Sequence, residues 1–443
     1  RCQDEFRDYL KKRYHGDIKE LNRAYWSTFW SHNFDNFDQI QAPTPLTDES
    51  IQGLILDWRR FVSSQTLDFM KAEVDAIREY SHDLPITTNM MPAFYELNYN
   101  EFENVIDVAS WDSYPDWNSP TGLYEAYRTA FWHDYFRTLK NRPYMLMESA
   151  PGLTNWKPYN KLKRPDMDVL SALQAIAHGS DTVQYFQWRK CRGNVEKFHG
   201  AVVDHVGTSN TRIFQEVQKT GAILKAIDEI AGTAVKSRVA ILFDWENMWA
   251  LDSSQAFQKQ NKKYEQTCVK YYNTFWKRGI NVDVIGPQKN FSSYDLVVLP
   301  MLYMTDKAMI NKIEEYVRNG GTVYATYMLG MVNETDLCYL GGYPAEQLKE
   351  VFGIWNEEID TLYPEESGGV VFDNKEYIVK DYAEIIHANT AKVLAKYSKD
   401  FYKDLPAFTV NDYGRGKAYY QAFRDDDFKD KAIASIINDL GLN

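Results

Sequence analysis

The stretch YMLMESAPG, from Tyr144 to Gly152, joins an apolar run to an acidic residue, Glu148, and then to a Pro-Gly break. An apolar run of this length that is bounded by a turn signal predicts a β-strand. Because the residues before it are apolar, the Glu148 carboxylate is expected to emerge at the rim of a sheet rather than on a solvated face. The segment therefore predicts an acidic side chain at the carboxyl end of a buried strand.

Three other segments have the same form, and helices separate them. Strands are expected over residues 85–89, 105–111, 144–148 and 182–188, and helices over residues 121–139, 166–179 and 210–230. Strands that alternate with helices predict a parallel sheet. A doubly wound sheet would usually carry a glycine-rich phosphate loop, and none is found, so the pattern favours a (β/α)₈ TIM barrel. Only four units are present, so residues 1–232 are predicted to form the C-terminal part of the barrel, with its first strands upstream of Arg1.

Helices precede these units. Residues 6–26 carry apolar side chains at helical spacing, with an interruption at His15-Gly16. A longer helix is expected next, capped by Thr47 or Asp48. Its predicted buried stripe comprises Ile51, Leu54, Ile55, Trp58, Phe61 and Val62.

Two further domains are expected beyond residue 232. Residues 233–367 alternate apolar strands with helices and predict a flavodoxin-like α/β domain. Its Gly320-Gly321 pair is interpreted as a helix C-cap and tight turn rather than a nucleotide site, because no glycine-rich loop opens a helix. Residues 368–443 contain short strands separated by turns and predict a small β-sandwich-like domain.

Charge and hydropathy exclude two kinds of partner. The formal net charge of −12 argues against nucleic-acid binding, because phosphates require clustered Lys and Arg. No apolar run reaches the ~18 residues that a membrane span needs. The sequence starts at Arg1 without Met or a signal-peptide pattern, which is typical of a piece of a longer polypeptide.

The four cysteines are scattered, a pattern typical of free thiols in a reducing compartment, so a cytoplasmic protein is expected. No metal site is predicted within the chain. Cys2 is a candidate ligand of a structural zinc site whose other ligands lie upstream, although a plain thiol is the simpler interpretation.

Glu148 is the first candidate for chemistry. A carboxylate at a strand end often only holds a loop, but Asn155-Trp156 follow closely and offer an amide and an indole to a sugar. Aromatic residues make up 15% of the sequence, as is common in carbohydrate-active proteins. Tyr114, beyond the preceding strand, either hydrogen-bonds the Glu148 carboxylate or packs under Pro115.

Glu196 and His199 are the other candidates. If their segment is helical, both lie on one face and clamp adjacent hydroxyls. The alternative is a solvated loop with an incidental histidine. Zinc binding by this pair has no third ligand nearby.

Several motifs recur in a recognisable order. They are FR, YL and FWS in residues 6–31, MESAPG with NW in 147–156, AHGSD in 177–181, YFQWR in 185–189, EKFHG in 196–200, FDWEN in 243–247 and VNETDL in 332–337. This series resembles glycoside hydrolase family 42, the β-galactosidases, and the similarity spans nearly all 443 residues.

The resemblance implies a retaining mechanism in which Glu148 attacks the anomeric carbon of the sugar. In addition, it implies a set of supporting and substrate-binding residues: Tyr114 beside the nucleophile, Trp156 in the sugar subsite, Glu196 and His199 on galactose hydroxyls, and Trp30 lining the pocket. The middle domain is similar to the family's trimerisation domain, which implies a homotrimer in which a neighbour helps to complete each active site. No cofactor is implied.

One part of the family pattern is not found in the sequence. The family's general acid/base is a Glu in an Asn-Glu pair on strand four, and the strand count places that pair before Arg1. Retaining hydrolysis needs two carboxyl groups about 5–5.5 Å apart. Asn333-Glu334 and Asn356-Glu357 fall too late in the chain to substitute. The 443 residues alone are therefore expected to be inactive as a hydrolase, with exposed sheet edges.

Three functions remain open from the sequence. The resemblance favours a β-galactosidase that hydrolyses terminal non-reducing β-D-galactose. An α-L-arabinopyranosidase is the related alternative, because that sugar shares the ring hydroxyls of galactose. A truncated, non-catalytic carbohydrate-binding protein is the alternative from another class, and an Asn-Glu pair upstream of Arg1 would exclude it.

Overall fold

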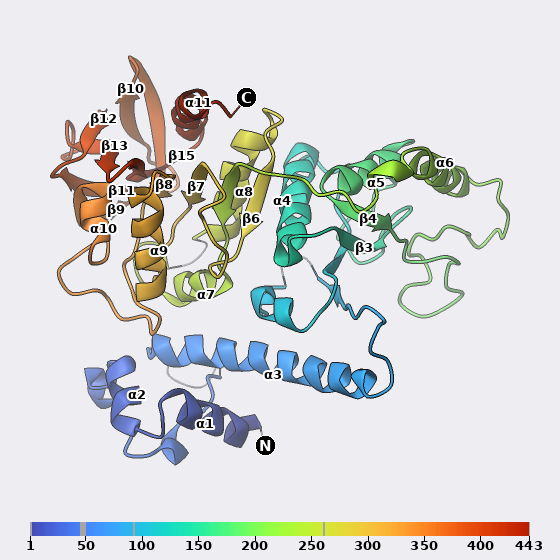
Figure 1. Cartoon of the computed structure of the whole chain (residues 1–443), viewed down its shortest axis with the longest axis horizontal. Coiled ribbons are helices and arrows are strands. Elements are labelled where there is room, and N and C mark those ends of the chain that lie inside the picture. The colour runs from blue at the N-terminus through green and yellow to red at the C-terminus, as the bar shows by residue number, and fades with distance from the viewer. Residues whose placement is uncertain (1, 45–49, 92–93, 260–261, 443) are drawn as a thin grey trace.

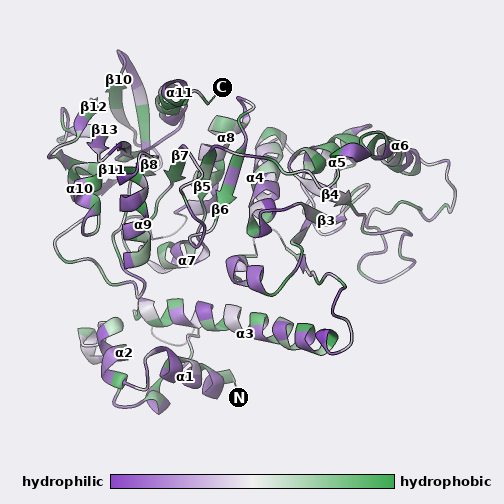
Figure 2. Ribbon diagram, viewed as in Figure 1, coloured by the Kyte–Doolittle hydropathy of each residue, from purple (hydrophilic) through white to green (hydrophobic). Residues whose placement is uncertain are grey.

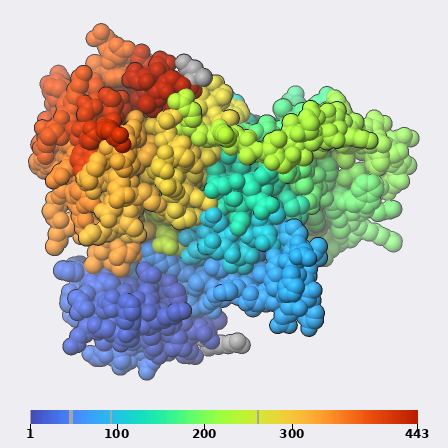
Figure 3. Space-filling model, in the orientation of Figure 1, coloured from blue at the N-terminus to red at the C-terminus, as the bar shows by residue number. Residues whose placement is uncertain are grey.

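The computed structural model describes residues 2–44, 50–91, 94–259 and 262–442, and they form three adjoining parts (Figures 1 and 3). A helical base lies along one side of the molecule. A small parallel sheet with its helices and a large mixed sheet lie above it. Figure 2 shows the strands β6 and β7 of the large sheet as strongly hydrophobic and α1 of the base as mostly hydrophilic.

The helical base confirms the predicted opening. Its elements are α1 (Cys2–Arg13), α2 (Ile18–Ala24), η1 (Phe29–Ser31), η2 (Phe37–Gln39) and α3 (Gln52–Arg78). Apolar residues of α1 and α2 pack on α3, whose predicted stripe is buried at Ile51, Leu54 and Phe61 and half-buried at its other three positions. The predicted caps Thr47 and Asp48 lie outside the described residues. The N-cap residue of α3 in the structure is Ile51, which provides no side-chain hydrogen bond.

The small sheet confirms the predicted four parallel strands. These are β1 (Asn89–Met90), β2 (Ser110–Ser113), β3 (Tyr144–Ser149) and β4 (Ser180–Val183), hydrogen-bonded in that order. The connecting and flanking helices are η3 (Tyr99–Asn104), α4 (Gly122–Lys140), α5 (Met167–Ala177), α6 (Arg212–Ala226) and η4 (Asp228–Ile230). The arrangement is that of the C-terminal part of a TIM barrel.

Two strand positions differ from the predictions for local reasons. β2 begins at Ser110 rather than at 105, because the Asp107 carboxylate accepts the Ile86 backbone N–H (2.7 Å) and pairs with Arg78. β4 ends at Val183 rather than at 188. Further on, the Phe186 N–H donates to the Ser149 carbonyl (3.0 Å), so this segment crosses over the end of β3.

The large sheet begins with the predicted flavodoxin-like unit. Strands β5 (Val239–Leu242), β6 (Val282–Ile285), β7 (Leu296–Leu299) and β8 (Thr322–Thr326) are parallel, in the order β6-β5-β7-β8. Its helices are α7 (Trp245–Ser253), α8 (Tyr264–Trp276), α9 (Lys307–Arg318) and α10 (Leu348–Phe352). Gly320 takes a positive φ of 111° directly after α9, as the C-cap interpretation requires.

The remaining strands extend this same sheet, because β14 pairs parallel with β8. They are β9 (Ile354–Thr361), β10 (Gly368–Phe372), β11 (Lys375–Ala388), β12 (Lys392–Tyr397), β13 (Pro406–Tyr413), β14 (Gly416–Gln421) and β15 (Phe423–Asp425), followed by α11 (Phe428–Leu440). β11 pairs with both β9 and β10, so the sheet continues across the predicted boundary at residue 368. The domain boundaries at 232 and 368 stay predictions.

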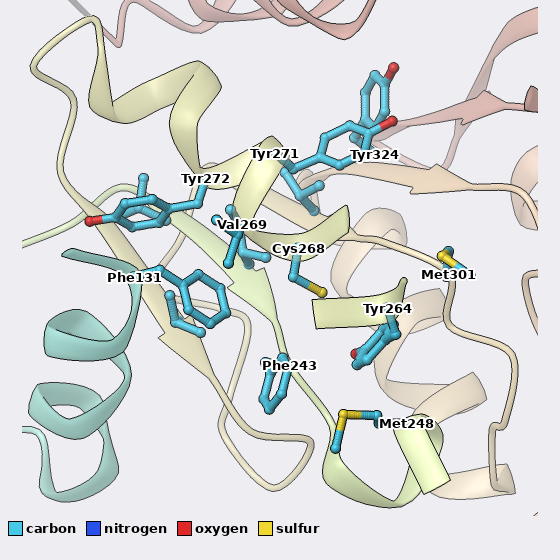
Figure 4. Packing of buried hydrophobic residues seen from close by; sticks show 14 of the residues in the cluster. Phe131, Phe243, Met248, Tyr264, Cys268, Val269, Tyr271, Tyr272, Met301 and Tyr324 are labelled. Atoms are coloured by element: carbon cyan, nitrogen blue, oxygen red, sulfur yellow. The ribbon is translucent and has the colours of Figure 1, made fainter. Parts of the chain in front are cut away.

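A shared core joins the two sheets through α4. Phe131 of α4 packs edge-on against Phe243, just after β5, and against Tyr272 of α8, with both pairs of ring centroids 5.7 Å apart (Figure 4). Arg137 of α4 pairs with Asp283 of β6 (2.9 Å). Because α4 directly precedes β3, this contact anchors the strand that carries Glu148 to the large sheet.

Candidate active site

Glu148 lies one residue before the end of β3, half-buried at the carboxyl edge of the small sheet. Tyr114 directly follows the neighbouring strand β2. Its hydroxyl donates a hydrogen bond to Glu148 Oε2 at 2.6 Å. Burial, reinforced by the Glu148 carboxylate, raises the pKa of Tyr114, so the phenol stays protonated and remains a donor. The structure thus contains the hydrogen bond that was considered for this tyrosine.

An aromatic cluster surrounds this pair. Trp156 meets the Tyr114 ring edge-on at a centroid distance of 4.9 Å and lies 4.9 Å from the His199 ring. Phe186, which the sequence analysis did not single out, packs edge-on against His199 at 5.3 Å. Trp156 remains 52% exposed, so its indole offers a face to a ligand. Glu148 therefore opens towards a wall of flat side chains, the kind of surface on which a pyranose ring stacks.

His199 is fully buried, and neither of its ring nitrogens has a hydrogen-bond partner among the described residues. Burial lowers the pKa of His199, so the imidazole is neutral at neutral pH and has one donor and one acceptor nitrogen. Two unpaired buried nitrogens are costly unless something binds them. The two ring nitrogens of His199 are thus a donor and an acceptor that no described residue uses.

Glu196 reaches the same site through a turn. The helical arrangement considered for Glu196 and His199 does not form, since residues 195–198 are a turn in which the His199 N–H donates to the Glu196 carbonyl (2.9 Å). The Glu196 carboxylate is half-buried and near enough to raise the pKa of Tyr114. A turn thus brings both side chains towards the Glu148 edge.

Three loops are joined around these residues. Asn155 Nδ2 donates to the Val195 carbonyl (2.6 Å), and Lys157 Nζ donates to the Tyr114 carbonyl (2.8 Å). Gly200 lies so close that a Cβ atom there would be 2.7 Å from the Leu153 carbonyl oxygen. A glycine is needed at this crossing, which fixes Trp156 relative to His199.

Trp30 is not part of this cluster. It belongs to η1, after α2 in the helical base, and Figure 1 shows α3 between α2 and the strands β3 and β4. The Trp30 side chain is 70% exposed, and its φ of 52° lies in the left-handed region. Its ring contacts among the described residues are with Phe29 and His32. A role for Trp30 in the pocket of its own chain has no support from this geometry.

Asp112, at the carboxyl end of β2, was not singled out in the sequence analysis, yet it lies beside Glu148. It is 1% exposed on β2, in register with Glu148 on β3. Asn89 Nδ2 of β1 donates to Asp112 Oδ2 at 2.9 Å. Burial, opposed by this hydrogen bond and assisted by Glu148, raises the pKa of Asp112 to about 6. The one feature of the sequence that could have indicated Asp112 is its position two residues before Tyr114.

Another Asn-Glu pair, Asn100-Glu101, was not weighed above. Glu101 lies in η3 and accepts a hydrogen bond from Ser63 of α3 (3.0 Å). Asn100 accepts one from Tyr135 of α4 (3.0 Å). This pair is engaged in packing η3 on its neighbouring helices rather than in the Glu148 cluster, so it does not supply the second carboxyl group.

Neither a metal centre nor a membrane segment is found in the part of the chain that the structure describes. No group of three or more His, Cys, Asp and Glu side chains there is arranged to hold a metal ion. Cys2 is an exposed free thiol, so a zinc site at Cys2 finds no support in these residues. No described helix is both long enough and apolar enough to cross a bilayer.

Comparison with known proteins gives matches along the whole chain. The family model described as β-galactosidase matches residues 1–227, and the model described as the β-galactosidase trimerisation domain matches residues 237–443. β-Galactosidase Pbg of Clostridium perfringens is 48% identical over 454 residues, a match that covers 100% of this chain and 66% of that protein. β-Galactosidase GanA of Bacillus subtilis is 44% identical, over 100% of this chain and 67% of GanA.

Solved structures agree. A catalytic mutant of Gan42B, a GH42 β-galactosidase from G. stearothermophilus, superposes with a TM-score of 0.98 at 45% identity, covering 100% of this chain and 66% of that one. The β-galactosidase from Bacillus circulans sp. alkalophilus gives a TM-score of 0.95 at 40% identity, covering 99% and 66%. The chain spans about two thirds of the length of the curated relatives it matches. The chain belongs to glycoside hydrolase family 42, the β-galactosidases.

Proposed function

We propose that the protein is a retaining β-galactosidase that removes terminal non-reducing β-D-galactosyl residues, with Glu148 as its nucleophile. The observation that carries this proposal is the 2.6 Å hydrogen bond from Tyr114 to Glu148 at the carboxyl edge of a parallel sheet, beside an open aromatic wall. In TIM-barrel enzymes that edge is where the chemistry lies. The names of the curated relatives favour galactosides over arabinopyranosides and over a binding-only protein.

The reaction would be a double displacement. Glu148 attacks the anomeric carbon and forms a glycosyl ester, while an acid group protonates the departing oxygen. The same group, now a base, then takes a proton from water, which attacks the ester and releases galactose with its configuration retained. We place this acid/base in the part of the relatives' length that the chain does not cover, because Asp112 beside Glu148 is buried and Glu196 is assigned to sugar binding. Neither step needs a cofactor.

The neighbouring residues would bind the sugar. Trp156 would stack on the pyranose ring through its exposed indole face. His199 is neutral and unpaired, so it would donate to one galactose hydroxyl and accept from another, as its two free nitrogens allow. Glu196 would accept from an adjacent hydroxyl. Tyr114 would keep Glu148 ionised and oriented for attack.

We further propose a homotrimer, since residues 237–443 match the trimerisation-domain model. Trp30, exposed on the helical base and away from Glu148 of its own chain, would then line the pocket of a neighbouring copy. Light scattering on the full-length protein tests the assembly, and a mass of one or two chains would contradict it.

Trapping of the covalent intermediate tests the nucleophile. The full-length wild-type protein, incubated with 2-deoxy-2-fluoro-β-D-galactosyl fluoride, is expected to gain the mass of one fluorogalactosyl group on the peptide that contains Glu148. Fluoride leaves without a proton, so this labelling does not depend on the acid/base. Glu148→Gln is expected to gain none, and Glu101→Gln serves as a matched control that still labels. Normal labelling of Glu148→Gln would refute the assignment.

A panel of aryl glycosides tests the substrate class. Aryl β-D-galactoside is expected to be cleaved fastest, with aryl α-L-arabinopyranoside slower because it lacks the hydroxymethyl group. Faster cleavage of the arabinopyranoside would favour the related activity, and binding of galactose without cleavage of any member would favour a carbohydrate-binding protein.

A further inference from the structure

Asp112 and Glu148 form a pair of carboxyl groups on neighbouring strands. β2 and β3 are parallel, and Asp112 lies opposite Glu148 in their register. In-register side chains on adjacent strands lie on the same face of the sheet, within contact of each other. The Glu148 carboxyl group is close enough to Asp112 to raise its pKa. The nucleophile thus has a second acidic group directly beside it.

The surroundings of the two groups differ. Asp112 is 1% exposed. Its hydrogen-bond donor from β1 is the neutral amide of Asn89, and the charged group that acts on it is Glu148. Asp112 Oδ1 is buried and has no partner among the described residues other than the Glu148 carboxyl group. No described cation pairs with Asp112. Glu148 is half-buried and already accepts from the Tyr114 hydroxyl.

Other titratable groups around the pair do not change this picture. Tyr99 packs on the β1 side and feels the Asp112 charge, while Tyr114, His199 and Glu196 lie on the Glu148 side. Burial raises the pKa of both tyrosines, and burial lowers that of His199. All three are therefore neutral near neutral pH, and none of them compensates a second negative charge.

Two adjacent carboxyl groups without a cation do not both ionise readily, so the pair keeps one proton over an extended pH range. Desolvation costs most for the charged form of the more buried group. Asp112 is 1% exposed, whereas Glu148 is half-buried, and each accepts one hydrogen bond from a described donor. The proton therefore belongs on Asp112, and the charge on Glu148.

We propose that Asp112 is a positioning residue for the nucleophile: on the acidic side of neutrality it is protonated in the free enzyme and its O–H donates to Glu148, so that Tyr114 and Asp112 hold the carboxylate from two sides. This inference rests on the proposed role of Glu148. Burial and the adjacent Glu148 raise the pKa of Asp112 to about 6, in agreement with the geometry. When Glu148 becomes an ester, its charge is gone, and the hydrogen bond from Asp112 weakens without any proton leaving the pair.

Three variants of the full-length enzyme separate a neutral donor from an anion. Asp112→Asn keeps a donor of the same shape and cannot ionise. Asp112→Ala removes the donor. Ser113→Ala, the next buried residue on β2, controls for disturbance of the strand. The profile of kcat/KM against pH for aryl β-galactoside is the main readout, because its acidic limb reports ionisation of the nucleophile in the free enzyme.

Asp112→Asn is expected to match Ser113→Ala in its acidic limb and to lose activity later than wild type as the pH rises, because its donor persists. Asp112→Ala is expected to lower kcat/KM about 10- to 100-fold, the factor that one hydrogen bond to a charged group supplies, and to move the acidic limb up by about one pH unit. An acidic limb that moves down in Asp112→Asn would show that Asp112 is an anion and overturn the proposal. So would an Asp112→Ala profile equal to that of Ser113→Ala.

A substrate-free measurement keeps this inference distinct from the proposed function. At pH 5, the difference between the infrared spectra of wild type and Asp112→Asn is expected to contain the C=O stretch of one protonated carboxyl group, because bands of other protonated groups such as Glu384 cancel. Its absence from this difference spectrum would overturn the proposal even if Asp112→Ala failed to fold. If the band is present but aryl β-galactosides are not cleaved, the carboxyl pair stands and the proposed function is the part that fails.

Discussion

Two glutamates, one in each sheet, each accept a hydrogen bond from a tyrosine hydroxyl but differ in their exposure to solvent. Glu148 on β3 accepts from the Tyr114 hydroxyl at 2.6 Å, and Glu384 on β11 accepts from the Tyr420 hydroxyl at 2.7 Å. Glu384 is 0% exposed, and its other oxygen accepts the Met328 backbone N–H at 2.7 Å. Glu148 is half-buried at the end of its strand.

The two carboxyl groups differ in whether an oxygen remains free to contact a ligand. The two oxygens of Glu384 are saturated by fixed donors inside a continuous sheet, so no ligand can reach them. Apart from Tyr114 and Asp112, no described residue donates to Glu148, and the Trp156 indole of the neighbouring aromatic cluster is 52% exposed. A tyrosine hydrogen bond alone therefore does not identify a catalytic carboxylate. An accessible oxygen at the carboxyl edge of a parallel sheet is what favours Glu148 as the proposed nucleophile.

Replacement of each carboxyl group by an amide is the strongest test of this contrast. Glu148→Gln in the full-length enzyme is expected to lower kcat about 10⁶-fold, as loss of a nucleophile does, with little change in Tm because the amide has the same shape. Glu384→Gln is expected to leave kcat close to wild type. Steady-state assays on aryl β-galactoside and a thermal melt of each variant measure both effects. A loss of activity in Glu384→Gln without a change in Tm would break the comparison.

The tyrosines give the next effect in size. Tyr114→Phe removes a donor that stabilises the ionised nucleophile and is expected to lower kcat/KM about 100-fold, the scale of one preorganised donor in an active site. Tyr420→Phe removes the equivalent donor from Glu384 and is expected to lower Tm while kcat/KM is retained. The pair of variants is its own matched control. If both tyrosines changed only the Tm, Tyr114 would be a packing residue.

The position of Glu148 could be predicted because its signal is local. An apolar run that ends at a turn identified β3, and the observed strand, Tyr144–Ser149, differs by one residue from the predicted one. The four-strand parallel sheet followed from the alternation of strands and helices, which is also read along the chain. In contrast, the start of β2 was predicted five residues too early. The Ile86 backbone N–H donates to the Asp107 carboxylate instead of to a neighbouring strand, and the sequence periodicity contains no sign of this side-chain contact.

Contacts between distant segments could not be predicted in this way. The importance of Asp112 depends on the register between β2 and β3. For Glu196 and His199 the sequence left a helix and a loop both open, and the structure has a turn. The parallel pairing of β14 with β8 joins residues almost a hundred positions apart into one sheet. Register and pairing of this kind are decided by packing in three dimensions, so a sequence pattern with period two or 3.6 does not contain them.

The smallest expected effect is on the pH dependence of the free energy of unfolding, and it concerns Glu384, the buried member of the pair. Burial, opposed by the Tyr420 and Met328 hydrogen bonds, raises the pKa of Glu384 to about 7 from an ordinary value of 4.5. A folded-state pKa above the unfolded one favours the folded state fully below about pH 4.5, and this contribution is lost as the pH rises through about 7. Glu384→Gln does not titrate.

Relative to wild type, the Gln variant is therefore expected to gain stability between pH 5 and pH 8, by roughly 2 kcal/mol, since one pKa unit corresponds to about 1.4 kcal/mol and the site relaxes in part. Denaturant unfolding of both proteins at the two pH values measures the difference. Glu358→Gln, at an exposed position of β9, serves as the control and is expected to show no such trend. A difference in stability that stayed constant with pH would mean that Glu384 is ionised in the folded protein. Glu384 and Glu148 would then carry the same charge, and the contrast between them would rest on solvent exposure alone.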